Sequence, residues 1–352
     1  MDRIKFDPKE LEPVGYIPSP IPGEKGLPIL NTPVPPRDNF MLMLERKKPL
    51  WMPMSSDYMI VAPTCMPDSW AHGVVFGPGI TDEQRGGKDM FGVEWEFVTS
   101  AHGAMVRPGN PLVKDITHWE DYITFPNIDE WDWASAKEDV RAAKERGCII
   151  RVAQMTGLFE RLISFVDMTD ALMSMIDEDA IPAIHRLFDY LCNLYDRLFE
   201  KYKKYLDADI VWFMDDWGTQ RAPFFSEATL REMLLPYLQR VVQSAHKYGM
   251  YLDFHSDGKL DSVASVIADT GCDLWEGQIL NDKEALIAQY GDRFIFNTQI
   301  DVPANATEAE MKAAVEKYFR IYGDKPAYCE CFGLPPECAV YLYEMSRKAY
   351  NT

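Results

Sequence analysis

One apolar segment of the chain ends in residues that could bind a metal ion. In Met250-Tyr-Leu-Asp-Phe-His255-Ser-Asp257-Gly258, an apolar run is followed by a histidine, a carboxylate and a glycine. Residues two apart on a β-strand point to the same face, so His255 and Asp257 can enter one cavity before Gly258 lets the backbone turn. The pattern predicts a buried strand with two metal-competent side chains at its C-terminal end. Taken alone, the segment fits an ordinary polar turn equally well.

Other apolar runs in the second half of the chain also end in polar side chains. The groups are Asp215, Asp216, Trp217 and Gln220 after 208–214, Glu276 and Gln278 after 272–275, Asn297 after 293–296, and Cys329, Glu330 and Cys331 in 327–331. Imidazole nitrogen, carboxylate oxygen and thiolate sulfur together suit zinc better than magnesium, which prefers oxygen alone. If the strands share one sheet, the sequence predicts a zinc site at its C-terminal edge.

The segments that would position these groups alternate between helix and strand from residue 135 onward. Helices are expected at 135–146, 158–205, 226–248, 258–269, 282–289, 307–322 and 335–348, and strands at 148–154, 208–214, 250–254, 272–275, 293–296 and 327–331. A further strand is expected at 49–54, and a hairpin from 91–98 and 103–106. About eight strands alternating with helices favour an α/β fold, a single (β/α)8 TIM-type barrel.

The beginning of the chain has a different composition. Nine of the first 36 residues are proline, which excludes regular helix or a central strand there. We therefore expect an extended Pro-rich arm over residues 1–37 and a barrel catalytic domain over residues 38–352. Such an arm would wrap its own domain or reach a second subunit, so a homo-oligomer is a plausible assembly.

Composition and charge narrow the class of partner. The 352 residues are 47% hydrophobic and carry a formal net charge of -19, which opposes binding to nucleic acid or to anionic membranes. No run approaches the roughly 18 apolar residues of a membrane span, and the start lacks a signal-peptide core. Seven scattered cysteines predict reduced thiols, so a cytoplasmic location is expected. Dinucleotide, P-loop and serine-hydrolase motifs are absent from the sequence.

Several separated motifs resemble the uroporphyrinogen decarboxylase superfamily, and specifically its corrinoid-dependent methyltransferase branch. They are Arg37-Asp-Asn-Phe, Phe91-Gly-Val-Glu-Trp, Gly157-Leu-Phe-Glu-Arg-Leu, Asp215-Asp-Trp-Gly-Thr-Gln, His255-x-Asp-Gly, Asn297-Thr-Gln-Ile-Asp and Gly333-Leu-Pro-Pro. The resemblance runs from about Asp38 to the C-terminus and implies a single (β/α)8 barrel. The decarboxylases carry an N-terminal arginine-rich motif, whereas Trp51-Met-Pro-Met-Ser-Ser-Asp contains no arginine.

One ligand position differs from the resembled methyltransferases. Those that act on coenzyme M bind zinc through His-x-Cys and a later cysteine, whereas this chain has His255-x-Asp257, with Cys331 as the nearest match to the later ligand. Replacing a thiolate by a carboxylate leaves zinc more electrophilic and better suited to polarising an ether oxygen. The resemblance therefore implies transfer of a methyl group from an O-methyl donor, such as an aryl methyl ether, to the cob(I)alamin of a partner corrinoid-binding protein.

The resemblance also assigns roles to the polar residues. His255 is the main zinc ligand, with Asp257, Glu276 and Cys331 as further ligands. Glu330 or Cys329 would replace Cys331, because Phe332-Gly333 adds a residue to the expected spacing. Asp216 and His255 are the expected catalytic residues. The expected substrate contacts are Asp215, Trp217, Gln220, Gln278 and Asn297.

Three other functions remain open at this point. The first is methyl transfer in the opposite direction, from the methylated corrinoid protein to a thiol or tetrahydrofolate. The second is decarboxylation of the uroporphyrinogen type. The third is a non-catalytic subunit that uses the barrel mouth only to dock a corrinoid protein.

Overall fold

The structure is a computed structural model that describes residues 4–18, 25–75, 80–101 and 103–351. The chain forms two compact units. The first unit contains residues 1–59, 143–149 and 282–352, and the second contains residues 60–142 and 150–281. Three elements lie at the boundaries in sequence: β3 (Tyr58–Val61), α3 (Arg141–Arg146) and β7 (Ile149–Gln154).

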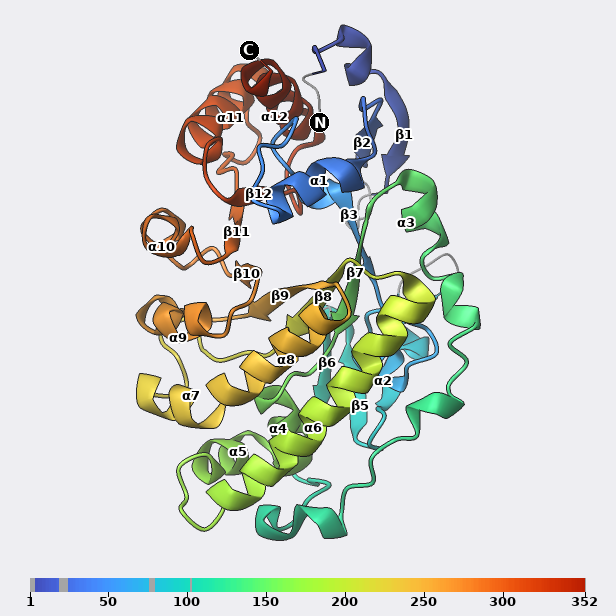
Figure 1. The fold of residues 1–352 in the computed structure, drawn as a ribbon, viewed down its shortest axis with the longest axis vertical. Coiled ribbons are helices and arrows are strands. Elements are labelled where there is room, and N and C mark those ends of the chain that lie inside the picture. The colour runs from blue at the N-terminus through green and yellow to red at the C-terminus, as the bar shows by residue number, and fades with distance from the viewer. Residues whose placement is uncertain (1–3, 19–24, 76–79, 102, 352) are drawn as a thin grey trace. The chain divides into compact units, whose positions relative to one another are not determined.

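The second unit contains the central parallel strands (Figure 1). Its strands β8 (Ile210–Met214), β9 (Tyr251–Ser256) and β10 (Leu274–Gly277) follow β7, and each pairs in parallel with the next along the chain. In this register Met214 lies opposite His255, and His255 lies opposite Glu276. Three neighbouring strands thus bring their C-terminal ends to one level.

Helices and short turns connect these strands. The α-helices are α2 (Pro67–Ala71), α4 (Phe159–Val166), α5 (Met168–Ser174), α6 (Ile181–Lys201), α7 (Glu227–Met233), α8 (Leu235–Lys247) and α9 (Ala264–Asp269). Shorter helical turns are η3 (Asp82–Gln84), η4 (Thr99–Ala101), η5 (Ile116–Asp121), η6 (Ile128–Glu130), η7 (Ser135–Lys137), η8 (Tyr202–Leu206) and η9 (Asp261–Val263).

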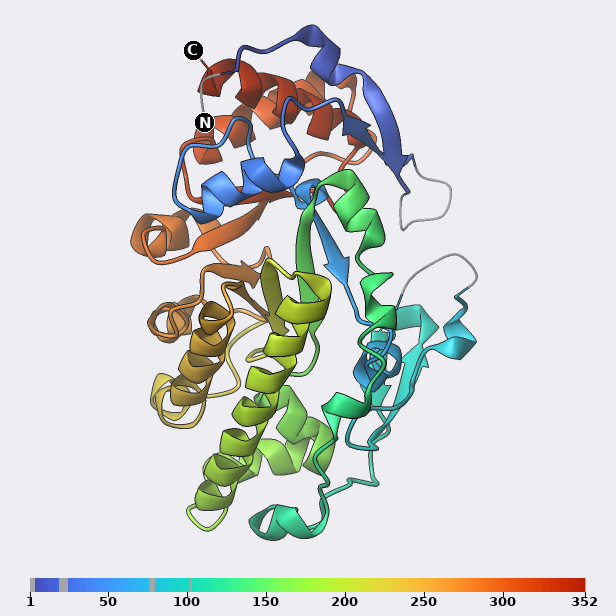
Figure 2. The same cartoon turned by 45° about the vertical axis from the view of Figure 1, so that its right-hand side comes forward.

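Helix α6 shows why these segments are helical. Its buried residues recur three or four positions apart, as in Ile184, Leu187, Phe188 and Leu191, so one stripe packs inward while the rest meets water. Figures 1 and 2 show α6 beside α8, a helix with the same kind of stripe. The structure divides the long helical stretch expected at 158–205 into α4, α5 and α6.

A small antiparallel sheet precedes these strands in the second unit. It consists of β4 (Gly87–Lys88), β5 (Glu94–Val98) and β6 (Gly103–Val106), with β5 paired to both neighbours. The β5–β6 pairing confirms the predicted hairpin.

The first unit contains the remaining parallel strands. Its elements include η2 (Ser55–Asp57), α1 (Pro36–Leu44), α10 (Lys283–Tyr290), β11 (Ile295–Gln299), α11 (Glu308–Tyr322), β12 (Ala327–Glu330) and α12 (Pro336–Tyr350). Strand β11 pairs in parallel with β12, and Cys329 of β12 forms a parallel bridge with Met54. The expected strand at 49–54 is thus reduced to this single bridge.

The order of the strands establishes the fold class. In each unit a core strand pairs in parallel with the strand that follows it along the chain, with a helical connection between them. An open doubly wound sheet reverses its strand order, whereas a TIM-type (β/α)8 barrel does not. The strand order therefore confirms the predicted α/β class of TIM-barrel type. None of the helices in the described part of the chain has the length and apolar character that crossing a bilayer requires.

The predicted arm is partly regular. Residues 1–3 and 19–24 lie outside the described residues, and the rest includes η1 (Pro8–Leu11) and a hairpin of β1 (Pro13–Ile17) with β2 (Leu27–Leu30). Glu10 is buried against α12, where its carboxylate accepts from Arg347 Nε and Nη2 and from the Tyr343 hydroxyl, each at 2.7 Å. The arm thus packs on the first unit of its own chain.

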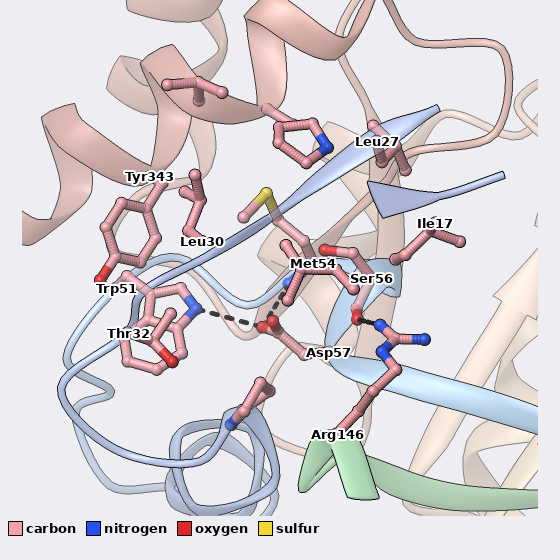
Figure 3. A pocket seen from close by; sticks show the side chains of 15 residues that line it. Ile17, Leu27, Leu30, Thr32, Trp51, Met54, Ser56, Asp57, Arg146 and Tyr343 are labelled. Carbon is pink, nitrogen blue, oxygen red and sulfur yellow. Dashed lines mark hydrogen bonds between the residues drawn. The ribbon is translucent and has the colours of Figure 1, made fainter. Parts of the chain in front are cut away.

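A small cavity of about 40 Å³ lies within the first unit, between the β1–β2 hairpin and α12. In Figure 3 the Asp57 carboxylate faces Trp51, and Arg146 points to Ser56. Asp57 Oδ2 accepts from Trp51 Nε1 at 3.2 Å and from the Met54 backbone at 3.1 Å. Burial raises the pKa of Asp57 to about 7, although these two hydrogen bonds and the nearby Arg146 act in the opposite direction.

Candidate metal centre

Three metal-competent side chains converge at the C-terminal ends of β8 and β9. Asp216, His255 and Asp257 each offer one ligand atom, and the three atoms lie within 4.8 Å of one another. His255 Nε2 is 3.6 Å from Asp257 Oδ1 and 4.0 Å from Asp216 Oδ1. All three side chains are partly accessible, so the cluster is open to a solute. One nitrogen and two oxygens at this spacing can hold a divalent cation.

The local backbone brings the three residues together. Strand β9 continues through Ser256, two residues beyond the predicted end at residue 254, so His255 lies inside the strand and Asp257 just after it. The alternation predicted for these two residues thus places them on one face. Asp216 follows β8, and its Oδ1 accepts from the backbone N–H of Asp257 at 2.7 Å. This bond ties the two loops to each other.

Gly258 allows the two loops to approach closely. Its φ is +107°, and a Cβ built there would lie 2.6 Å from the backbone carbon of Gly218. A side chain at this position would both strain the backbone and push the β8 and β9 loops apart. The glycine expected to turn the chain is therefore required by backbone packing as well.

The other edge of the His255 ring faces Glu276. His255 Nδ1 lies 3.4 Å from Glu276 Oε1, while Glu276 Oε2 forms an ion pair with Arg151 Nη2. The same Arg151 nitrogen pairs with Asp253 Oδ2. Glu276 was predicted as a zinc ligand, and the structure places it beside His255 with one oxygen paired to Arg151.

Arg151 is buried inside the strand layer. Its side chain is 1% exposed, and its guanidinium lies 4.4 Å from the centroid of the Trp212 ring. Trp212 in turn contacts His255 edge-on, with ring centroids 5.4 Å apart. A buried arginine requires anionic partners, and two carboxylates supply them.

Electrostatics at the cluster are dominated by carboxylates. Burial is the largest effect on the pKa of His255 and lowers it, but Glu276, Asp216 and Asp257 together raise it above the usual value. Burial raises the pKa of Asp257, and repulsion from Asp216 raises it further. Burial raises the pKa of Glu276, but Arg151 and His255 lower it by more, so its pKa lies below the usual value. A bound cation would relieve the repulsion between Asp216 and Asp257.

Glu160 is a further acidic group near the cluster. It lies in the first turn of α4, and its backbone N–H donates to Asp215 Oδ1 at 2.9 Å. Burial raises its pKa well above the usual value, followed by repulsion from Asp216 and Asp215. Both effects favour the protonated form of the Glu160 carboxyl.

Asp215 and Trp217 flank Asp216 in the loop that follows β8. Both are fully buried, and Asp215 Oδ2 accepts from Trp217 Nε1 at 2.9 Å. Burial raises the pKa of Asp215 to about 6. These contacts hold the loop, and the predicted contact of the two residues with substrate remains a prediction.

Gln220 and Gln278 meet at the rim of the cluster. Gln220 Nε2 donates to Gln278 Oε1 at 3.2 Å, and the same oxygen accepts from the Gly258 backbone at 3.1 Å. Gln278 also hydrogen-bonds Asp257. The structure thus brings these two predicted substrate contacts to the metal-competent residues.

The other predicted site residues belong to the first unit. Asn297 is buried in β11 and accepts from Lys283 Nζ at 2.7 Å. Cys329 and Cys331 are buried, and Cys331 Sγ donates to the Cys329 carbonyl at 3.8 Å.

Glu330 is engaged by its own surroundings. Its Oε1 accepts from Ser55 Oγ at 2.6 Å and from the backbone of Cys331 at 2.9 Å, and its Oε2 accepts from the Tyr58 hydroxyl at 3.3 Å. Both oxygens are thus held by donors of the first unit. The ligand roles suggested for Cys331, Cys329 and Glu330 remain predictions.

Three residues near the cluster carried no predicted role: Arg151, Asp253 and Glu160. The sequence did contain a signal for Arg151 and Asp253, because each is a charged residue inside an apolar strand, where only a partner makes burial tolerable. Glu160 lies in a motif of the resemblance, but its position in a first helical turn is also typical of an ordinary surface carboxylate.

Comparison with known proteins gives no family assignment. No protein-family model matches the chain, and no curated protein matches it. Among solved structures, a D-psicose 3-epimerase crystallised with D-fructose is similar at 13% identity and a TM-score of 0.34, over 62% of this chain and 81% of that chain.

Two further solved structures show the same level of similarity. A xylose isomerase-like TIM barrel protein from Mycobacterium smegmatis, in complex with magnesium, has 13% identity and a TM-score of 0.35, over 62% of this chain and 79% of that chain. An endo-beta-1,4-xylanase from Gloeophyllum trabeum has 11% identity and a TM-score of 0.36, over 57% and 68%. Similarity this low carries no conclusion about function, and the fold class rests on the chain's own strand order.

Proposed function

We propose that this protein is a zinc-dependent methyltransferase, which moves a methyl group from an O-methyl donor to the cob(I)alamin of a partner corrinoid-binding protein. The observation that carries the proposal is the convergence of His255, Asp216 and Asp257 at the ends of parallel strands, where each residue offers one ligand atom and the three atoms lie within 4.8 Å of one another. The sequence resemblance to corrinoid-dependent methyltransferases supports the reaction class.

The donor set fits zinc. Three protein ligands with an open fourth position are the usual arrangement of a catalytic zinc site, and an imidazole favours zinc over magnesium. Asp216 replaces Glu276 in the predicted ligand set because its Oδ1 lies on the Nε2 side of the ring. When bound, zinc would polarise the ether oxygen of the donor.

The surrounding residues would orient the donor and receive its oxygen. The proposed reaction would break the bond between the methyl carbon and the oxygen and leave the bonding pair on the oxygen, while the partner's cob(I)alamin would supply the electron pair that binds the methyl group. Glu160 lies beside the cluster, where burial raises the pKa of its carboxyl and so favours the form that can donate a proton. Gln220 and Gln278 offer amide groups at the rim for the rest of the donor. A proton donor and two amide groups beside the cluster suit an aryl methyl ether or a similar small methoxylated molecule as the donor.

The cysteines support a cellular location for the proposed reaction. All seven cysteines are free, which supports a reducing compartment, and we place the enzyme in the cytoplasm.

The test of the proposal is a screen of methoxylated aromatic compounds with cob(I)alamin and zinc-loaded protein. Methyl transfer is detected by the change in the cobalamin spectrum. Loss of methyl transfer in Asp216→Ala and Asp257→Ala, with the donor consumed only by wild-type protein, is the expected result. Methyl transfer only in the opposite direction, from methylcobalamin to a thiol or to tetrahydrofolate, would contradict the proposal.

A further inference from the structure

We propose that Glu276, held in place by Arg151, is a positioning residue that fixes the tautomer of His255 and so keeps Nε2 available for the metal ion. The inference rests on the metal site of the proposed function and assigns Glu276 a role other than the ligand role predicted from sequence.

The two edges of the His255 ring meet different surroundings. Nε2 faces the open cluster, 3.6 Å from Asp257 Oδ1, whereas Nδ1 faces Glu276 Oε1 at 3.4 Å. A neutral imidazole carries one N–H and one lone pair, and a carboxylate can only accept a hydrogen bond. Nδ1 is closer to its carboxylate than Nε2 is to Asp257 or to Asp216, which lies at 4.0 Å, so Glu276 favours the proton on Nδ1 and leaves the lone pair on Nε2 for a metal ion.

Arg151 gives Glu276 a fixed position and a fixed charge. Arg151 Nη2 contacts Glu276 Oε2 and Asp253 Oδ2, so Glu276 has one oxygen on arginine and the other beside histidine. Strand pairing places Glu276 directly opposite His255, and the Trp212 ring lies against both Arg151 and His255. Carboxylates that orient a ligand histidine in this way are a recurrent feature of metal sites.

The alternative is that these charges serve only the stability of the strand layer. An ion pair with that purpose would leave the imidazole tautomer and the metal affinity unchanged when the carboxylate becomes an amide of the same shape. The two explanations therefore differ in a quantity other than activity.

The variant Glu276→Gln separates them. Arg151 has only donors, so it would attract the amide oxygen and leave the amide NH₂ group facing His255 Nδ1. His255 would then accept at Nδ1 and carry its proton on Nε2, which cannot bind a metal ion in that form. We expect the variant to switch tautomer and to lose about 10- to 100-fold in zinc affinity.

The experiment measures the nitrogen chemical shifts of ¹⁵N-labelled His255 in metal-free protein at about pH 9, where an imidazole is neutral. Zinc affinity is measured by competition with a chromogenic chelator, and the ligand field by the visible spectrum of the Co²⁺-loaded protein. The matched control is Glu227→Gln, because Glu227 is an exposed carboxylate paired with Arg231 in the same unit. The control should keep both the tautomer and the affinity of wild-type protein.

Two results would overturn the inference. One is a wild-type His255 protonated on Nε2, a measurement that needs no variant and stands even if Glu276→Gln does not fold. The other is a folded Glu276→Gln variant with unchanged tautomer and unchanged zinc affinity. Failure of methyl transfer, combined with the tautomer switch and the loss of zinc affinity, would instead contradict the proposed reaction and support this inference.

Discussion

His255 and Glu276 lie opposite each other on the paired strands β9 and β10, with His255 Nδ1 3.4 Å from Glu276 Oε1. This relationship divides the carboxylates of the site into two groups. Asp216 and Asp257 lie on the Nε2 side of the ring, where a cation would bind, and Glu276 lies on the Nδ1 side.

The carboxylate of Asp257 should set the reactivity of the metal. In Asp257→Cys, a thiolate would retain zinc but donate more electron density to it, which makes the ion a weaker Lewis acid. We expect wild-type zinc content with turnover of the O-methyl donor reduced about 10-fold or more. Zinc analysis and the cobalamin assay on one preparation check both values. Wild-type turnover in a zinc-loaded Asp257→Cys protein would refute the argument from ligand type.

Gly258 should be required for the approach of the two ligand loops. In Gly258→Ala, the added methyl would lie 2.6 Å from the Gly218 backbone carbon, at a φ of +107°. We expect a loss of about 1–3 kcal/mol in the free energy of unfolding, together with weaker zinc binding. Chemical denaturation and chelator competition measure the two effects.

The control for that variant is Gly249→Ala. Gly249 also has a positive φ, +72°, but nothing lies within 4 Å of its Cβ position. It should lose about 1 kcal/mol of stability and keep its zinc affinity. Equal loss of zinc affinity in the two variants would show that the close approach to Gly218 is irrelevant.

The positions of His255 and Asp257 could be predicted from the sequence, whereas the surroundings of Glu276 could not. Alternation along one strand suffices to place the first two on one face, and the structure has them there. The environment of Glu276 depends on Arg151, which comes from β7. Arg151 pairs with Glu276 and Asp253, and both are far from it in the sequence. That contact is fixed by strand register, which a single sequence does not specify.

The limits of the strands illustrate the same point. The apolar run ends at Phe254, yet β9 continues to Ser256, because its pairing with β10 extends through His255 and Ser256. The predicted helical regions do contain helices, but the expected helix at 226–248 is divided into α7 and α8, and the one at 258–269 is reduced to η9 and the short α9. By contrast, the Pro-rich arm contains a β1–β2 hairpin that its proline content concealed.

The arm should contribute to stability through Arg347. This guanidinium is buried, pairs with both oxygens of Glu10 and also donates to the backbone of Ile4 at 3.2 Å. Arg347→Ala would leave the Glu10 carboxylate buried without its cation, at a cost of about 3–5 kcal/mol. We expect a lower denaturation midpoint and faster proteolysis of the first 30 residues or so.

An exposed ion pair of the same unit provides the control. Lys25 and Glu337 are 3.3 Å apart, with side chains 81% and 41% exposed. Lys25→Ala should change stability by less than about 1 kcal/mol. Similar losses in Lys25→Ala and Arg347→Ala would contradict the assigned role of the buried pair.

The buried Asp57 should make stability depend on pH. Burial raises its pKa in the folded protein to about 7, well above the usual value for an aspartate. A carboxyl with a raised folded pKa stabilises the fold below its unfolded pKa, and that contribution is lost as the pH rises through the folded value. Between about pH 5 and pH 8, wild-type protein should lose about 2 kcal/mol relative to Asp57→Asn.

Denaturation of both proteins across that pH range tests this expectation. The difference between them removes the contributions of all other titrating groups, because those groups are shared. A difference that does not change with pH would mean that Asp57 is ionised in the folded protein at pH 5.

The central claim is a zinc ion held by His255, and metal analysis tests it most directly. Wild-type protein purified without chelator should contain about one zinc per chain, whereas His255→Ala should contain less than about a tenth of that. The exposed His118, which pairs with Asp115 at 3.1 Å, gives the control variant His118→Ala, which should match wild-type protein. Equal zinc in wild-type and His255→Ala proteins would contradict the account.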